Sequence, residues 1–400
     1  MNTDNVRIDK ITADLEKKYT GDPDHDVRVI QEYCSTLPRC EESARLTAAL
    51  SQYAAEKFPT AHAIRIGKAV DETIQMLEKQ FNGDPDHDVG IIQDYCKALP
   101  KTEDNFKITV ILGQYAAARY PDAKEIRRSK EEFKRMNDEA GKLKQRVTDI
   151  QELVRTGEKA KAIAEIRAIL EEHKLPTDTE SRLISFSHPF EECLFHEYYK
   201  ETTSLMRISN LPEMLNLQLG SLLTDDGRTD EAREALAVTL SLNPVSAPAH
   251  IEMAHIALRE KDYDEAYTWL QKAYPLIFNA QMLAIYFLSL ASVVEHLDKN
   301  YPLSAAFAHL SLSYADNPPA HEHLDHLAKT YGIDPQKPSD DMIEKLAEEA
   351  DLPVAACPQI SEIAVRVAHE IKNANPEISK LFLTIAYELT HDEAIAKEIR

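Results

Sequence analysis

An acidic heptapeptide that occurs twice carries the residues best suited to bind a metal ion. Gly21-Asp22-Pro23-Asp24-His25-Asp26-Val27 recurs without change at residues 83–89. Carboxylates on alternate residues resemble the start of a calcium-binding loop. That loop needs glycine where Val27 stands and a bidentate glutamate where Tyr33 stands, so the match to a calcium loop fails.

The same residues suit the start of a helix. Gly21 would end one helix, Asp22 would cap the next, and Pro23 fits the first helical position. Asp24 and Asp26 would complement the dipole of that helix, with the histidine between them. We therefore expect no metal and no cofactor at these two loops.

A second cluster, His321-Glu322-His323-Leu324-Asp325-His326, also contains side chains that bind metals. It lacks the H-E-x-x-H spacing of zinc proteases, and the preceding Pro318-Pro319 favours a solvated or helix-capping role. The sequence offers no phosphate-cradling glycine loop, no nucleophile elbow and no cysteine with a placed histidine. These absences predict that the protein is not an enzyme.

Composition limits the partners and the compartment. The net charge of −22 over 400 residues disfavours nucleic acid and anionic lipid, which attract basic surfaces. We expect a cytoplasmic protein, because the amino terminus has no signal-peptide pattern and no apolar run approaches the ~18 residues of a membrane span. Five scattered cysteines predict buried free thiols: Cys34, Cys40, Cys96, Cys193 and Cys357.

The amino-terminal part of the chain is expected to be a tandem duplication. The heptapeptide repeats after about 62 residues, and Leu15-Glu16-Lys17 and Gln52-Tyr53-Ala54-Ala55 recur at the same period. Each copy predicts three helices, and glycine is scarce, with 10 residues in all. The sequence therefore predicts an all-α fold that begins with a duplicated helical module over residues 1–123.

A long connecting helix is expected over residues 124–146. From Ile126 to Val154, apolar residues alternate at spacings of three and four, which is a heptad pattern broken only by Ser129. This seam would pack against neighbouring helices of its own chain, or it would pair two chains as a homodimer over residues 126–154. Gly141 lies in the middle and favours a kink there.

A second period of about 34 residues follows in the segment expected to form a domain over residues 147–335. Gly220 corresponds to Ala254, Ala232 to Ala266, and Leu236 to Leu270. Small residues where two helices touch, surrounded by large apolar ones, resemble the tetratricopeptide repeat (TPR) family. A looser pair lies near residues 290–318 and an incomplete one near 153–169. His250 and Asn216 depart from the pattern, since the family prefers large apolar residues there.

The resemblance implies a solenoid of helix pairs whose first helices line a concave surface that binds a protein or peptide. Residues 336–400 would form a helical cap. On helical phase, the partner-binding candidates are Gln218, Ser221, Asp225, Glu252, His255, Arg259, Glu295 and Asp298. Because this set is mainly acidic, it would prefer basic or neutral partners over the carboxylate tails that some TPR grooves bind.

Two functions follow from this resemblance. The first is a non-catalytic adaptor or scaffold that binds a protein. The alternative is a peptide-responsive regulator similar to the TPR sensors of Gram-positive bacteria. Segments such as Ser187-His188-Pro189-Phe190 and Gly332-Ile333-Asp334-Pro335 are also similar to those of TPR-containing proteins from anaerobic Gram-positive bacteria. The aromatic residues around Pro189 would form core packing or an exposed contact patch.

Overall fold

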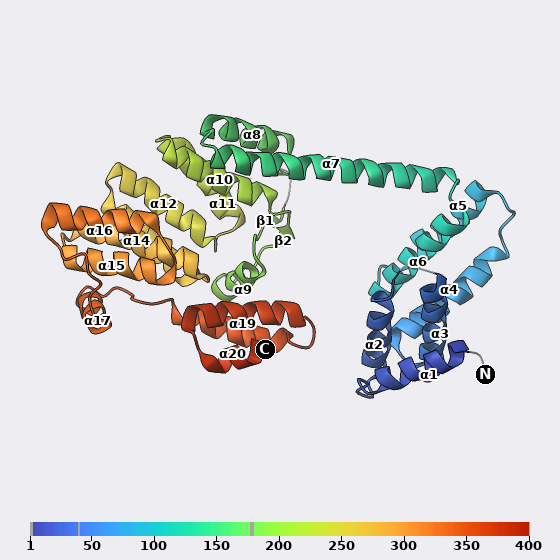
Figure 1. Ribbon diagram of the computed structural model, residues 1–400. Coiled ribbons are helices and arrows are strands. Elements are labelled where there is room, and N and C mark those ends of the chain that lie inside the picture. The colour runs from blue at the N-terminus through green and yellow to red at the C-terminus, as the bar shows by residue number, and fades with distance from the viewer. Residues whose placement is uncertain (1–2, 39–40, 177–179, 400) are drawn as a thin grey trace. The chain divides into compact units, whose positions relative to one another are not determined.

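The computed structural model describes residues 3–38, 41–176 and 180–399 and shows an all-α helical repeat protein (Figure 1). About 75% of the chain is helical, and many of the helices pack as adjacent pairs. The chain divides into two compact units, unit 1 over residues 1–144 and unit 2 over residues 145–400.

Unit 1 contains two three-helix modules followed by the first part of a long helix. The helices of the first module are α1 (Thr3–Glu16), α2 (Pro23–Ser35) and α3 (Glu41–Lys57). Those of the second module are α4 (His62–Glu78), α5 (Pro85–Ala98) and α6 (Glu103–Arg119). Each module has its own small core, and residues that differ by 62 in number lie in both cores, for example Val27 and Val89.

The two heptapeptides act as helix-capping devices. Asp22 and Asp84 accept hydrogen bonds from the backbone nitrogens of Asp24 and Asp86, which confirms the predicted capping. Asp24 and Asp86 were expected to serve the dipole of their own helices. They also accept the first backbone amides of later helices, at His62 of α4 and at Lys124. Their carboxylates therefore tie each module to the helix that follows it.

The last aspartate of each heptapeptide is buried in the turn. Asp88 accepts hydrogen bonds from the backbone nitrogens of Asn82 at 2.9 Å and Gly83 at 3.2 Å and from the Tyr120 hydroxyl at 2.9 Å. Burial alone would raise the pKa of Asp88, but the hydrogen bonds, including one with His87, lower that pKa overall. These carboxylates are occupied by protein donors.

The long helix α7 (Lys124–Arg155) is continuous through Gly141 and extends past residue 146, where the connecting helix was expected to end. Its apolar seam packs within the chain near both ends. Ile126 contacts the core of the second module, and Ile150 is fully buried. Between these points, residues 127–142 are all exposed.

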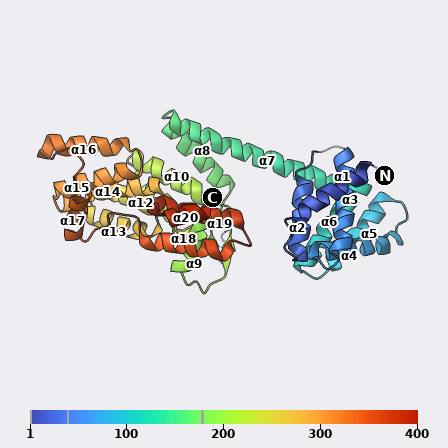
Figure 2. The same cartoon turned by 60° about the horizontal axis from the view of Figure 1, so that its bottom comes forward.

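Unit 2 continues from α7 as a series of helix pairs (Figures 1 and 2). The early helices are α8 (Lys159–Glu172), α9 (Pro189–Tyr198), α10 (Leu211–Asp225), α11 (Thr229–Leu242), α12 (Ala247–Glu260) and α13 (Tyr263–Ala273), followed by the 3-10 turn η1 (Tyr274–Leu276). The later helices are α14 (Ala280–Leu297), α15 (Tyr301–Tyr314), α16 (Pro318–Tyr331), α17 (Asp340–Glu349), α18 (Pro358–Ile371), α19 (Pro376–Thr390) and α20 (Glu393–Ile399).

Small residues allow close contact within the pairs α10–α11 and α12–α13. A Cβ atom on Gly220 of α10 would lie 2.6 Å from the Leu236 side chain of α11. Ala254 of α12 and Ala266 of α13 are fully buried. These positions are those at which the sequence predicted that two helices touch.

The two polar departures from the apolar repeat pattern are buried and hydrogen-bonded. Asn216 Nδ2 donates to the Pro212 carbonyl at 2.8 Å. His250 Nδ1 donates to the Ser246 carbonyl at 2.9 Å, and burial lowers the pKa of His250. Each side chain bonds to the carbonyl one turn earlier in its own helix, so a polar residue is accommodated at each buried position.

A short parallel sheet interrupts the helices, which the sequence did not predict. Strand β1 (Arg182–Ile184) pairs with β2 (Leu205–Arg207), with Leu183 opposite Met206. Between the strands, Phe190 and Phe195 of α9 are fully buried, whereas Tyr198 and Tyr199 at its end are exposed. The aromatic cluster is therefore core packing with two exposed tyrosines at its margin.

The carboxyl-terminal helices share one core with the repeats. Phe382 of α19 contacts Phe190 of α9, with ring centroids 5.2 Å apart, and Arg366 of α18 pairs with Glu197 of α9 at 2.6 Å. Helices α18 and α19 therefore pack back against α9, and α17 contacts α15. The segment predicted to form a cap therefore shares its hydrophobic core with the repeats.

One helix corrects the expectation that no apolar run is long enough to span a membrane. Helix α14 has 18 residues and is long and apolar enough, by length and composition alone, to cross a membrane, but 56% of it is buried inside the protein, as in the core helix of a folded domain.

Within the described residues, Cys357 is buried, whereas Cys34, Cys96 and Cys193 are only half-buried; all four are free thiols. Cys40 lies outside the described residues.

Candidate binding face on the first helices

The residues predicted to contact a partner lie on the first helices of three successive pairs, which pack side by side (Figure 2). We call these residues the first-helix face: Gln218, Ser221 and Asp225 on α10, Glu252, His255 and Arg259 on α12, and Glu295 and Asp298 at the end of α14. Asp225, Arg259 and Asp298 are exposed, and Gln218, Ser221, Glu252 and His255 are half-buried.

Polar contacts join neighbouring helices across this face. Asp225 of α10 lies 3.6 Å from the Arg259 guanidinium of α12 and also accepts Lys159 of α8 at 2.8 Å. His255 of α12 contacts the Ser289 hydroxyl of α14 at 2.9 Å. Since Ser289 donates its one proton to the Ile285 carbonyl, His255 Nε2 is the donor in this contact.

The charges of the face are unevenly balanced. Asp225 is shared by Lys159 and Arg259, whereas Glu252 lies 3.7 Å from His255, which is cationic only when protonated. Asp298 is exposed just beyond the end of α14. With neutral histidine, the face carries excess negative charge, which suits a neutral or basic ligand.

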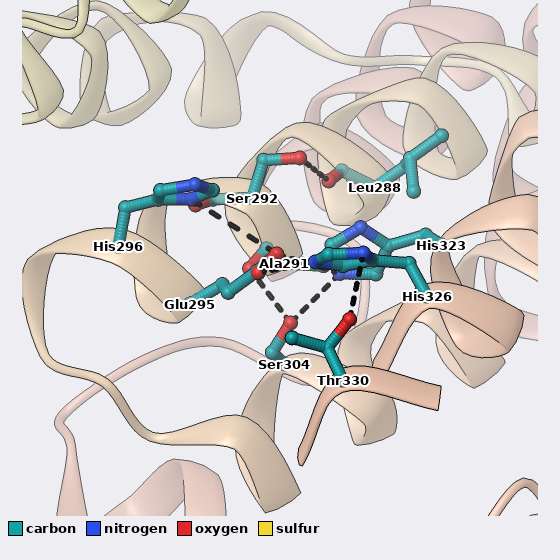
Figure 3. Close-up of polar contacts among 9 residues, drawn as sticks. All are labelled: Leu288, Ala291, Ser292, Glu295, His296, Ser304, His323, His326 and Thr330. Atoms are coloured by element: carbon teal, nitrogen blue, oxygen red, sulfur yellow. Dashed lines mark hydrogen bonds and ion pairs between the residues drawn. The ribbon is translucent and has the colours of Figure 1, made fainter. Parts of the chain in front are cut away.

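Glu295 does not present its carboxylate to a partner. Helical phase placed it on the face, but its side chain is only 3% exposed and points toward α16 (Figure 3). Its carboxylate oxygens lie 3.0 Å from His326 Nε2 and 3.8 Å from His323 Nε2. His296 Nδ1 is a more distant neighbour at 4.0 Å. Packing of α16 therefore removes Glu295 from the available surface.

The same contacts correct the solvated or capping role expected for the cluster at residues 321–326 only at His323, because the other polar members, His321, Glu322, Asp325 and His326, are exposed. His323 is 12% exposed, and burial lowers its pKa, which favours the neutral ring. The Ser304 hydroxyl donates to the Ala291 carbonyl at 2.9 Å and so accepts from His323 Nε2 at 2.8 Å (Figure 3). Hydrogen bonds thus connect α14, α15 and α16 behind the face. His321, by contrast, is 64% exposed.

A second buried polar group, which the sequence analysis did not identify, links the segment before α9 to α10. Glu191 accepts the backbone amides of Ser187 at 2.8 Å and His188 at 3.0 Å, and Glu213 accepts the Ser187 hydroxyl. Burial, with the Glu213 charge nearby, raises the pKa of Glu191 to about 7. The one sequence signal was an acidic residue three positions after His188, which is capping-box spacing.

Comparison with known proteins does not add to this description. No protein-family model matches the chain, and no curated protein is significantly similar to it. Inference about function therefore depends on the geometry of the first-helix face.

Proposed function

We propose that unit 2 is a TPR-type binding module and that the chain is a non-catalytic cytoplasmic adaptor for a protein or peptide. The observation that carries this proposal is the row of partly exposed polar side chains on α10, α12 and α14, joined by the Asp225–Arg259 and His255–Ser289 contacts. A ligand lying across three helices would meet side chains whose positions are already fixed, which reduces the entropy lost on binding.

The TPR assignment is supported by the packing inside the pairs. Gly220 against Leu236, together with the buried Ala232, Ala254 and Ala266, gives the small-residue contacts typical of that family. We also propose that the two amino-terminal modules arose by duplication, since matched core residues occur at the 62-residue period. A relationship to TPR proteins of Gram-positive bacteria is part of the same proposal.

A display library of random peptides, selected on the full-length protein, would supply a probe ligand. The double variant His255→Ala/Arg259→Ala is expected to weaken its binding at least about tenfold, measured by fluorescence anisotropy, because it removes the contact area of two large side chains and the Arg259 guanidinium donor from the middle of the face. Helicity by circular dichroism should remain unchanged.

The matched control removes two exposed side chains from second helices, in the variant Asp230→Ala/Gln271→Ala on α11 and α13. It should bind like the wild-type chain. Equal affinity of all three proteins would contradict the assignment of the face. A large change of hydrodynamic radius on saturation with peptide would favour the peptide-responsive regulator over the adaptor.

A further inference from the structure

The middle of α7 exposes apolar side chains in a regular pattern. Residues 127–142 are exposed on every side of the helix, yet Phe133 and Met136 leave 65% and 59% of their surfaces in water. Both belong to the heptad seam, with Ala140 and Leu143 following at spacings of four and three. A phenylalanine exposed to water does not stabilise an isolated helix, so apolar residues at this spacing indicate that a second helix packs against them.

The charges beside the seam are sorted by sign. Glutamates recur every seven residues along one flank at Glu125, Glu132 and Glu139. The other flank carries Lys130 and Lys144, with an asparagine at the intervening heptad position. One edge of the seam is therefore acidic and the other is basic or neutral.

We propose that the middle of α7 pairs with the same segment of a second copy of this chain, as a parallel, in-register coiled coil. In a parallel pair, a residue on the acidic flank of one helix lies opposite the residue that is five positions later on the other flank of the partner helix. Glu125 would then face Lys130 of the other chain, and Glu139 would face Lys144. An antiparallel pair would place glutamate against glutamate and lysine against lysine.

The contacts within one chain are compatible with this pairing. Glu132 lies 3.1 Å from Arg128 and Glu139 lies 3.8 Å from Arg135, both one turn away on the same exposed helix. Exposed pairs of this kind hold their partners weakly, so the glutamates can turn toward a second helix. Because α7 is already a continuous helix, pairing does not have to nucleate it.

Space for a second helix exists beside the amino-terminal part of the seam. Ile126, Ser129 and Phe133 border an open groove of about 730 Å³ whose other walls come from α5 and α6. The pairing cannot extend over the whole predicted seam, because Ile150 is fully buried within the chain, whereas Ile126 is only half-buried against its own module. We place it between residues 126 and 144, which corresponds to about two and a half heptads.

A comparison between the modules supplies a variant that should fold. Helix α4 begins 62 residues before α7, and the residue of α4 that corresponds to Phe133 is Asp71. Replacing Phe133 with aspartate therefore gives α7 a residue that α4 already has at the same place. Phe106→Asp is the matched control, since Phe106 is 70% exposed on α6 and lies outside the seam.

Sedimentation velocity of the full-length chain over a range of concentrations tests the proposal. The wild-type mass should rise from 45.2 kDa toward twice that value. Phe133→Asp should raise the dissociation constant of the dimer by about 100-fold, because each chain would then bury a charge. Phe106→Asp should leave it unchanged. A wild-type chain that stays monomeric at about 100 μM, or an equal effect of both variants, would overturn the proposal.

Orientation is tested by reversing the acidic flank. Glu125→Lys/Glu139→Lys should weaken a parallel dimer about tenfold at low salt, with a smaller effect at high salt, because the new lysines would face Lys130 and Lys144 of the partner. In an antiparallel dimer, the same variant would replace a repulsive contact between two glutamates with a repulsive contact between two lysines, so its dissociation constant should not change. An unchanged dissociation constant would therefore exclude the parallel arrangement.

Discussion

Replacing Gly220 with valine is expected to destabilise unit 2 by about 2 to 4 kcal/mol. A Cβ atom there would lie 2.6 Å from both Cγ and Cδ2 of Leu236, which is fully buried and cannot move aside freely. The branched side chain would push α10 away from α11. In a unit of this size, the melting temperature should fall by roughly 5 to 15 °C.

The matched control is Gly113→Val on α6. Gly113 is also helical, but a Cβ atom there would meet nothing within 4 Å. Valine is a somewhat better helix former than glycine, so the change should be neutral or slightly stabilising. Scanning calorimetry of both variants distinguishes steric overlap from helix propensity. Equal melting temperatures would refute close packing of α10 on α11.

Glu191→Gln is expected to stabilise unit 2 above neutral pH and to have little effect near pH 4.5. The amide oxygen of glutamine can still accept the amides of Ser187 and His188. Burial and the nearby Glu213 raise the pKa of Glu191 from 4.5 to about 7. The folded protein therefore binds this proton more tightly than the unfolded chain, and stability falls as pH rises from about 4.5 to about 7.

The largest gain from the glutamine should thus appear at pH 8 and should reach about 2 to 3 kcal/mol. Urea denaturation at pH 5 and pH 8 measures it. Glu192→Gln is the control, because its carboxylate is paired with Arg207 at 2.6 Å and is partly exposed. That control should show no gain at either pH. A Glu191→Gln gain independent of pH would mean that the carboxyl is not protonated on folding.

Features determined by neighbouring residues were predictable from the sequence. The heptapeptides end one helix and cap the next, as their glycine, aspartate and proline spacing indicated. The close contact between Gly220 and Leu236 followed from small and large residues at the helical period. In both cases the interacting groups lie within about one helix pair of each other along the chain.

Features that depend on distant segments were not predictable in this way. Helical phase assigned Glu295 to the binding face, but only the packing of α16 shows that His323 and His326 enclose its carboxylate. Asp24 caps a helix that begins 38 residues later. Glu191 and Glu213 meet because Ser187, in the segment before α9, donates to both carboxylates, and a single-sequence pattern does not report such tertiary contacts.

The proposal that the first helices bind a partner is tested most directly by site-specific photo-crosslinking. A photoreactive amino acid would replace Ser221 on the first-helix face or, as a control, Gln271 on α13. With the selected peptide present, we expect a crosslinked product at position 221, its loss in competition with unlabelled peptide, and none at position 271. Crosslinking at 271 alone, or equally at both positions, would contradict the assignment of the binding face.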